Sequence, residues 1–99
     1  MLKAAFIFIA PGADRKEANA LVPTEGVELT VVGVQTYDQG VAVAKELVDK
    51  GCAAIELCGG FGHKGTAAVV DAVAGKAAVG VVRFDVHPGL GNQSGDALF

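Results

Sequence analysis

Hydrophobic residues gather in four short runs along the chain, at residues 4–9, 28–34, 53–57 and 78–84. Three of these runs are almost wholly apolar and rich in Val, Ile or Phe. Continuous apolar runs of this length are typical of strands that are covered on both faces. The pattern therefore predicts four buried β-strands.

The segments between these runs have the residue spacing of amphipathic helices. We expect three helices, at residues 14–22, 38–50 and 66–74. In the first, Asp14 and Glu17 resemble a capping box, and Pro23 ends the segment. The second keeps its apolar residues on one face and stops at Gly51. The third carries only Asp71 as a charge, which indicates a helix buried on more than one side.

Strands that alternate with helices predict βαβ units with right-handed crossovers and a parallel sheet. We expect an α/β fold with a single open, parallel, four-stranded sheet in the flavodoxin-like order 2-1-3-4, three helices and a C-terminal arm. No repeat or linker divides residues 1–99, so we expect a single domain with a βα core at 1–84 and the arm at 85–99. The arm ends in Leu98 and Phe99, which favours an ordered segment over a frayed terminus.

Charge and hydropathy narrow the classes of protein to consider. The formal charge is −3 without any run of like charge, which argues against a nucleic-acid partner. No apolar stretch nears the roughly 18 residues of a membrane span. The N-terminal apolar run is interrupted by Pro11, which favours a buried strand over a signal peptide. Without a secretory signal, Cys52 and Cys58 are expected to be free thiols of a cytoplasmic protein.

The expected strand order places a binding site. In open parallel sheets, ligands bind beyond the carboxyl ends of the strands, where the strand order reverses. With the order 2-1-3-4, that point lies between the first and third strands. The turn with Pro11 and Gly12 and the turn at residues 58–65 would therefore border one crevice.

The turn at residues 58–65 holds a Gly-x-Gly-x-x-Gly motif between a strand and a helix. Its glycines would let amide N–H groups approach an anion at the positive end of the helix. Asp85 follows at the spacing of a dinucleotide fingerprint, but the chain has room for only half of such a domain. We expect a smaller phosphate- or carboxylate-bearing ligand and no cofactor; the alternative is a tight, empty turn. The expected ligand-binding residues are Pro11, Gly12, Gly59, Gly60, Phe61, Gly62, Lys64, Gly65, Thr66, Arg83 and Asp85.

Cys58 is a candidate nucleophile in the same turn. It follows a strand, precedes a helix, and has His63 and Lys64 nearby, features that activate a thiol. Cys58 and Lys64 have the spacing of the Cys-x5-Arg phosphatase loop, but lysine stands where that loop needs a bidentate arginine. The alternative is an inert core cysteine.

Two further titratable residues are catalytic candidates. Glu56 lies in an apolar strand, where a carboxylate is costly to bury unless it is paired. Arg83 is its expected partner, in a structural ion pair or beside a general acid or base. His87 would meet His63 or Cys58 if the arm folds over the crevice, but this set lacks the spacing of known ligands and we expect no metal. The candidate catalytic residues are Cys58, Glu56, His63 and His87.

Four segments, at residues 5–12, 55–63, 81–85 and 87–89, resemble those of a family of small bacterial α/β proteins catalogued as a domain of unknown function. The resemblance covers nearly the whole chain. It implies a single domain in a bacterial cytoplasm, and it implies no substrate and no catalytic residue.

Three functions stay open at this point. The leading hypothesis is an oligomeric protein that binds a small anionic metabolite at the glycine-rich turn, with or without converting it. The second is an enzyme with Cys58 as nucleophile and a histidine as base. The third is a non-catalytic interaction module. The nearly uncharged helix at 66–74 predicts a homodimer through that helix.

Overall fold

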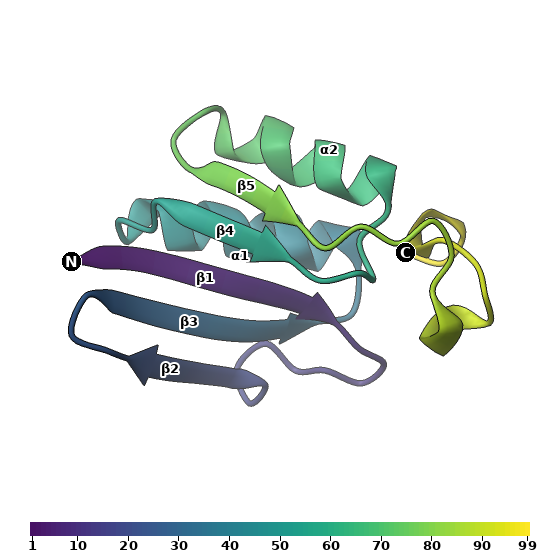
Figure 1. Ribbon diagram of the computed structural model, residues 1–99, viewed down its shortest axis with the longest axis horizontal. Coiled ribbons are helices and arrows are strands. Elements are labelled where there is room, and N and C mark those ends of the chain that lie inside the picture. The colour runs from purple at the N-terminus through teal and green to yellow at the C-terminus, as the bar shows by residue number, and fades with distance from the viewer.

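The computed structural model describes residues 1–99, which form a five-stranded mixed sheet and two α-helices (Figure 1). The strands are β1 (Leu2–Ile9), β2 (Asn19–Pro23), β3 (Val27–Val34), β4 (Ala54–Leu57) and β5 (Ala78–Val81). The helices are α1 (Tyr37–Asp49) and α2 (His63–Val73), and two short 3-10 helices follow, η1 (Pro88–Leu90) and η2 (Gly95–Ala97). The α/β class is confirmed, whereas the expectation of a purely parallel four-stranded sheet with three helices is wrong.

The strand order of the sheet is β2-β3-β1-β4-β5. The four strands β3, β1, β4 and β5 run parallel, in the order expected for the four predicted strands. The additional strand β2 pairs antiparallel with β3 at the edge of the sheet.

The segment at residues 14–22, which we expected to be a helix, makes one turn and then becomes β2. The carbonyl of Asp14 accepts hydrogen bonds from the N–H groups of Glu17 and Ala18, and the carbonyl of Ala18 then accepts from Gly33 in β3. The pairing gives hydrogen-bond partners to backbone groups at the edge of β3, which would otherwise have none in the sheet. This gain exceeds the weak preference of the segment for a helix. The signal for it was the short turn at residues 24–26 between two apolar runs, which is typical of a hairpin.

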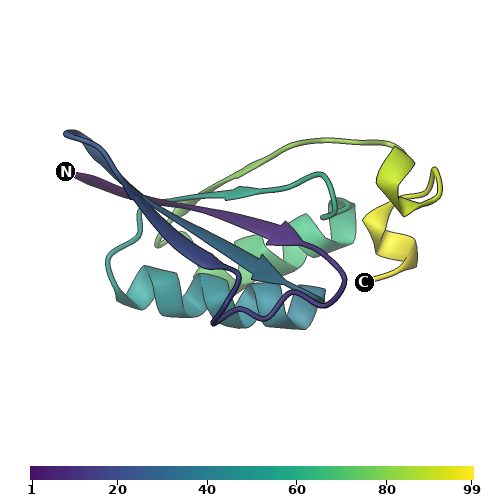
Figure 2. The same cartoon turned by 90° about the horizontal axis from the view of Figure 1, so that it is seen from below.

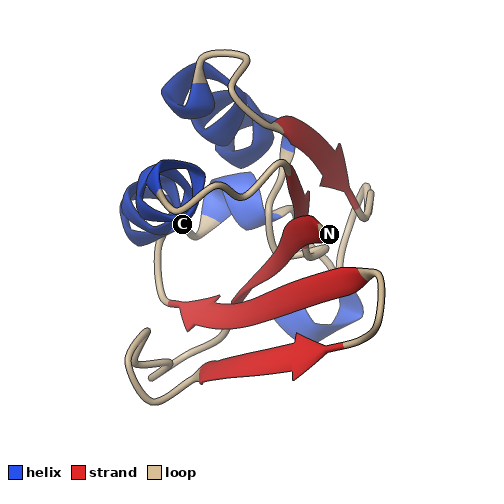
Figure 3. Cartoon of the chain, turned by 90° about the vertical axis from the view of Figure 1, so that its left-hand side faces the viewer, coloured by secondary structure: helices blue, strands red, loops and turns tan.

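Both α-helices cover the same face of the sheet (Figures 2 and 3). Buried residues alternate along the three central strands and pack against the helices: Ala5 and Ile7 in β1, Val32 and Val34 in β3, and Ile55 and Leu57 in β4. Helices on both faces of such a sheet need crossovers in both directions. Here the connection from β1 to β3 forms β2 instead of a helix, so the other face has no helix over it.

The C-terminal arm lies over the carboxyl ends of the parallel strands (Figure 1). The strand β5 ends at Val81, earlier than expected, and the chain then leads into η1 and η2. The ring of Phe99 lies 6.2 Å from the ring of Tyr37, whereas Leu98 is exposed. The arm is therefore folded, and it occupies the position where we expected an open crevice.

Candidate functional site

The amide groups of the glycine-rich turn are engaged within the protein itself. The N–H of Gly60 donates to Cys58 Sγ at 3.3 Å, and the N–H of Gly62 donates to Tyr37 Oη at 3.0 Å. The N–H of Gly65 points to Asp96 Oδ1 at 3.4 Å. The three amides that we expected to hold a ligand are therefore already bonded to side chains of this chain.

The carboxylate of Asp96, in η2, occupies the positive end of α2. It accepts hydrogen bonds from the N–H of Lys64 at 3.1 Å and from Tyr37 Oη at 2.7 Å, besides the contact with Gly65. Burial by itself would raise the pKa of Asp96, but these hydrogen bonds lower the pKa below its usual value. The carboxylate of Asp96 thus accepts from N–H groups in the first turn of α2, at the position where we expected the anion of a ligand.

The hydroxyl of Tyr37, which donates to Asp96, is held in its neutral form. Burial and the hydrogen bond to Asp96 raise the pKa of Tyr37 to about 12. Its ring stacks on Phe61 with a centroid distance of 5.6 Å. Tyr37 therefore joins the start of α1, the glycine-rich turn and the arm in one network of hydrogen bonds.

The glycines at this site permit close approach by other parts of the chain. A Cβ atom at Gly62 would collide with the carboxylate of Asp96, and one at Gly95 would collide with the carbonyl oxygen of Gly60. At Gly65 a Cβ would lie 2.5 Å from the ring of Tyr37. The motif correctly marks a place of close approach, but the groups that approach are the protein's own.

Cys58 is half-buried and helps to hold the turn in place. Its Sγ accepts hydrogen bonds from the N–H groups of Ile9 and Gly60, each at 3.3 Å. No hydrogen bond joins the thiol to His63 or His87. The structure therefore does not form the thiol–imidazole pair that the nucleophile hypothesis requires.

His87 organises the arm. Its Nδ1 accepts from the N–H of Gly89 at 2.9 Å, and its backbone pairs with Gln93. The imidazole packs on the ring of Phe84 with a centroid distance of 4.5 Å. These contacts hold the imidazole of His87 within the arm.

The expected ion pair between Glu56 and Arg83 is not formed. Arg83 donates to Asp85 at 2.6 Å, and its Nη2 lies 3.2 Å from His63 Nε2. The reason is the register of the two strands, which places Gly80 beside Glu56. Arg83 lies three residues further along the chain, beyond the end of β5. Glu56 is exposed on the face of the sheet that has no helix.

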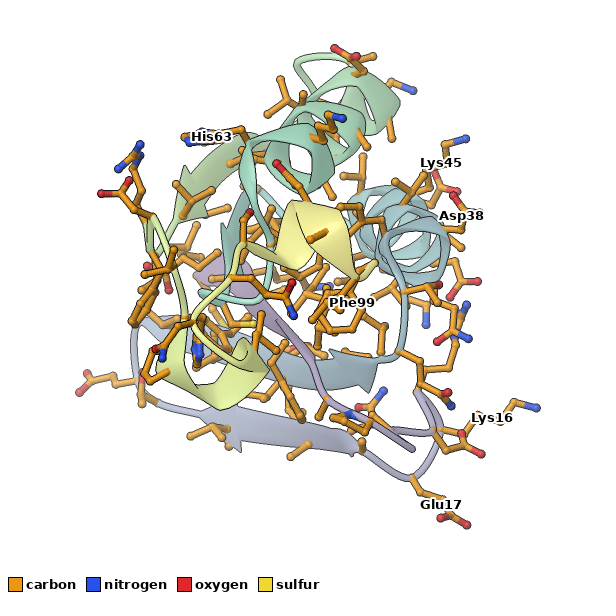
Figure 4. The ribbon with its side chains drawn as sticks, turned by 90° about the vertical axis from the view of Figure 1, so that its right-hand side faces the viewer. Lys16, Glu17, Asp38, Lys45, His63 and Phe99 are labelled. Atoms are coloured by element: carbon orange, nitrogen blue, oxygen red, sulfur yellow. The ribbon has the colours of Figure 1, made fainter.

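A small hollow of about 100 Å³ lies between the start of α2 and the end of β5. Its lining residues are Phe61, Gly62, His63, Thr66, Val81, Val82, Arg83 and Phe84. Because Arg83 can only donate, this contact is a hydrogen bond when Nε2 of His63 accepts it. The backbone N–H of His63 and the hydroxyl of Thr66 have no hydrogen-bond partner in the protein. Figure 4 shows His63 at the periphery, well away from Phe99 in the arm.

The remaining candidate residues lie outside this hollow. Pro11 and Gly12 form an exposed turn, and no atom lies within 4 Å of a Cβ placed on Gly12. Lys64 and Asp85 are exposed, and Gly59 packs against the ring of Phe84. The structure therefore brings together His63, Thr66 and Arg83 and separates them from Glu56.

Sequence reasoning missed Tyr37 and Asp96. Tyr37 was outside the expected helix, and Asp96 lies in a short polar segment without periodicity. Asp96 is 32 residues beyond Lys64, whose N–H it accepts. The Ser-Gly-Asp sequence at residues 94–96 signals a turn, but nothing local links that turn to α2.

Nowhere in the chain do three His, Cys, Asp or Glu side chains gather closely enough to hold a metal ion. Neither helix has the length and hydrophobicity needed to cross a membrane. Comparisons with curated proteins and with solved structures find no match. A family model described as a family of unknown function (DUF6506) matches residues 2–97, and the chain belongs to this family.

Proposed function

We propose that this protein binds a small oxyanion, such as the carboxylate or phosphate group of a small organic molecule, in the hollow between α2 and β5. The observation that carries the proposal is the meeting of Arg83 and His63, 3.2 Å apart, at the first residue of α2. A guanidinium group binds carboxylates and phosphates through two parallel hydrogen bonds. The proposed site lies beside the glycine-rich turn and does not use the amides that bind Asp96.

The other polar groups of the hollow have the right chemistry for an anion. The backbone N–H of His63 lies at the positive end of α2 and has no partner in the protein. The hydroxyl of Thr66 lies one turn further along the same helix. Both groups are donors, so together with Arg83 they offer hydrogen bonds from two elements.

The competing anion at this position is weakly held. Asp85 already pairs with Arg83, but the two side chains are 79% and 58% exposed. Exposed ion pairs of this kind contribute about 0–1 kcal/mol. A ligand that adds hydrogen bonds from His63 and Thr66 can therefore displace Asp85 from the guanidinium group.

The hollow limits the size and character of the ligand. A volume of about 100 Å³ accommodates an anionic group and only a few further atoms. Half of the lining residues are hydrophobic, among them Phe61, Val81 and Phe84. We therefore expect a short organic anion with a compact apolar part to bind better than inorganic phosphate.

The test is an NMR titration of isotope-labelled protein with inorganic phosphate, acetate and isobutyrate. We expect saturable shifts at the amides of His63, Thr66 and Arg83, and tenfold weaker binding (about 1.4 kcal/mol) for Arg83→Gln. Arg15→Gln is the matched control, because Arg15 also forms an exposed ion pair, with Glu46, on another part of the surface. Equal binding by both variants, or no saturable shift with any probe, would refute the proposal.

A further inference from the structure

The face of the sheet opposite the helices is apolar, and neither α-helix covers it (Figures 2 and 3). The pairing register and the alternation of side chains assign its residues, which are Leu2, Ala4, Phe6, Phe8, Ala20, Val22, Val27, Leu29, Val31, Gly33, Ala54, Glu56, Ala78 and Gly80. We call this set the open face. Glu56 is its only charged or polar residue.

Most charged and polar side chains of the strands lie on the helix-covered side of the sheet, and not on the open face, where contact with water would favour them. On the helix-covered side, positions near the margins carry Lys3, Asn19, Glu28 and Thr30. On the open face, even residues at strand ends are apolar, such as Leu2 at 44% and Val22 at 48% exposure. When one face of a sheet is in contact with water, residues along each strand normally alternate between apolar on the core side and polar on the water side. Parallel sheets are almost always covered on both faces. The pattern therefore indicates that something covers this face.

We propose that the open face is a homodimer interface, in which the sheets of two copies of this chain pack face to face. Strand lengths and strand spacing give the open face a plane of about 500 Å² per copy. Two copies would bury about 1,000 Å², which reaches the lower size of a stable biological interface. Apolar residues beyond the strand β5 extend the area, since Val82, Phe84 and Val86 are 45%, 40% and 54% exposed. In Figure 2 this segment passes on the side of the sheet away from the helices.

The single charge of the open face is compatible with burial of the rest. Glu56 lies beside Gly80 of the edge strand β5, and its Cγ is 3.9 Å from the position of a Cβ on Gly80. The absence of a side chain at Gly80 leaves the carboxylate a route past the edge strand to solvent. The centre of the face, formed by the long strands β1 and β3, contains no polar group.

This interface differs from a dimer through α2, which the lack of charge in that helix predicted. Val70 is the large apolar residue that α2 leaves exposed, at 45%. One exposed valine is ordinary for a protein surface, whereas a continuous apolar sheet face is not. The size and continuity of the open face favour it over α2 as the contact between copies.

Sedimentation equilibrium across a range of concentrations tests the interface with two matched variants. Val31→Glu places a charge at the centre of the open face, beside Phe6 and Ala20 in the register. We expect a dimeric wild type, and a dissociation constant raised at least about 30-fold in Val31→Glu. Val70→Glu places the same charge on α2, and we expect it to remain a dimer.

Val22→Glu is the second variant in case Val31→Glu does not fold, because Val22 is exposed on the edge strand β2. Circular dichroism establishes that each variant keeps its fold. A monomeric wild type at all concentrations would overturn the proposal, as would a dimer that survives charges at Val31 and Val22. Dissociation by Val70→Glu alone would instead identify α2 as the interface. Val22, Val31 and Val70 do not line the hollow near Arg83, so the oligomeric state of these variants is measured separately from ligand binding there.

Discussion

The two α-helices begin in different ways. At the start of α1, the Oγ1 of Thr36 accepts from the N–H of Gln39 at 3.2 Å, and Gln39 in turn accepts from the N–H of Gln35 at 2.9 Å. At the start of α2, the N-cap residue is Gly62, which has no side chain to accept a hydrogen bond. The missing acceptors come from Tyr37 and from Asp96 in the arm.

The difference shows what a glycine-rich helix start means in this protein. The first turn of an α-helix leaves several N–H groups without partners, and a folded protein must satisfy them when they are buried. In α1 this is done by neighbouring residues, and in α2 by a carboxylate distant in sequence. The glycines near α2 give that carboxylate room, so the same motif that predicts a ligand site also fits an internal cap.

The largest effect on the two helix caps is expected for Asp96→Ala, which removes the remote cap of α2. The variant loses a charged acceptor shared by Lys64, Gly65 and Tyr37, and we expect the free energy of unfolding to fall by about 2 kcal/mol. Urea denaturation measures this change, and limited proteolysis shows whether the arm has been released. Asp85→Ala is the control within the arm, because its exposed ion pair contributes at most about 1 kcal/mol.

The stability that Asp96 contributes depends on pH in a defined direction. Because the pKa of Asp96 is lower in the folded protein than its ordinary value of 3.8, the carboxylate binds a proton more readily in the unfolded chain. The contribution is therefore complete above the unfolded pKa and is lost as the pH falls through the folded pKa. A difference between wild type and Asp96→Ala that persists unchanged in strong acid would contradict this role.

The hydrogen bond between Tyr37 and Asp96 can be observed directly, because Tyr37 is the only tyrosine of the chain. Absorbance of the tyrosinate should titrate with a pKa of about 12, and in Asp96→Asn it should move towards the ordinary 10.0. The raised pKa also means that stability decreases as the pH rises from the unfolded value of 10.0 through the folded one. A wild-type titration near 10.0, in protein that circular dichroism shows to be folded, would mean that the arm is not docked in solution.

The smallest of these effects is expected at the local cap of α1. Thr36→Ala removes one neutral acceptor and should cost about 1 kcal/mol of unfolding free energy, without releasing the arm. Urea denaturation and the same proteolysis assay measure both effects. Thr36→Ser keeps the hydroxyl and serves as the control. If Thr36→Ala destabilised the protein more than Asp96→Ala does, the remote cap would not be the stronger of the two.

Much of the parallel core could be predicted because its signals are local. Apolar runs such as 4–9 and 28–34 mark buried strands wherever they occur, and the stop at Gly51 bounds α1 closely. The prediction of a helix at 14–22 was wrong because its amphipathic pattern is weak and because residues 19–23 pair with the edge of β3. In this segment, hydrogen bonding with β3 stabilises a strand more than the local sequence stabilises a helix.

The structure brings together only some of the candidate site residues. The glycine-rich turn, His63, Thr66 and Arg83 were identified from the sequence, and the structure brings the last three to one hollow. The expected partner of Arg83 was wrong, because the apolar pattern does not give the register between β4 and β5, which pairs Glu56 with Gly80. The role of Asp96 was invisible, because no local rule pairs residues 32 apart.

By itself, the sequence determined the α/β class, the order of the parallel strands and the turn where close approach occurs. These features follow from hydrophobic spacing and from glycine, which act over a few residues. Only the tertiary structure decided that the arm caps α2, that β2 joins the sheet and that both helices lie on the same face of it. Each of those outcomes is a competition between distant segments for unsatisfied backbone groups and apolar surface, which the folded chain resolves as a whole.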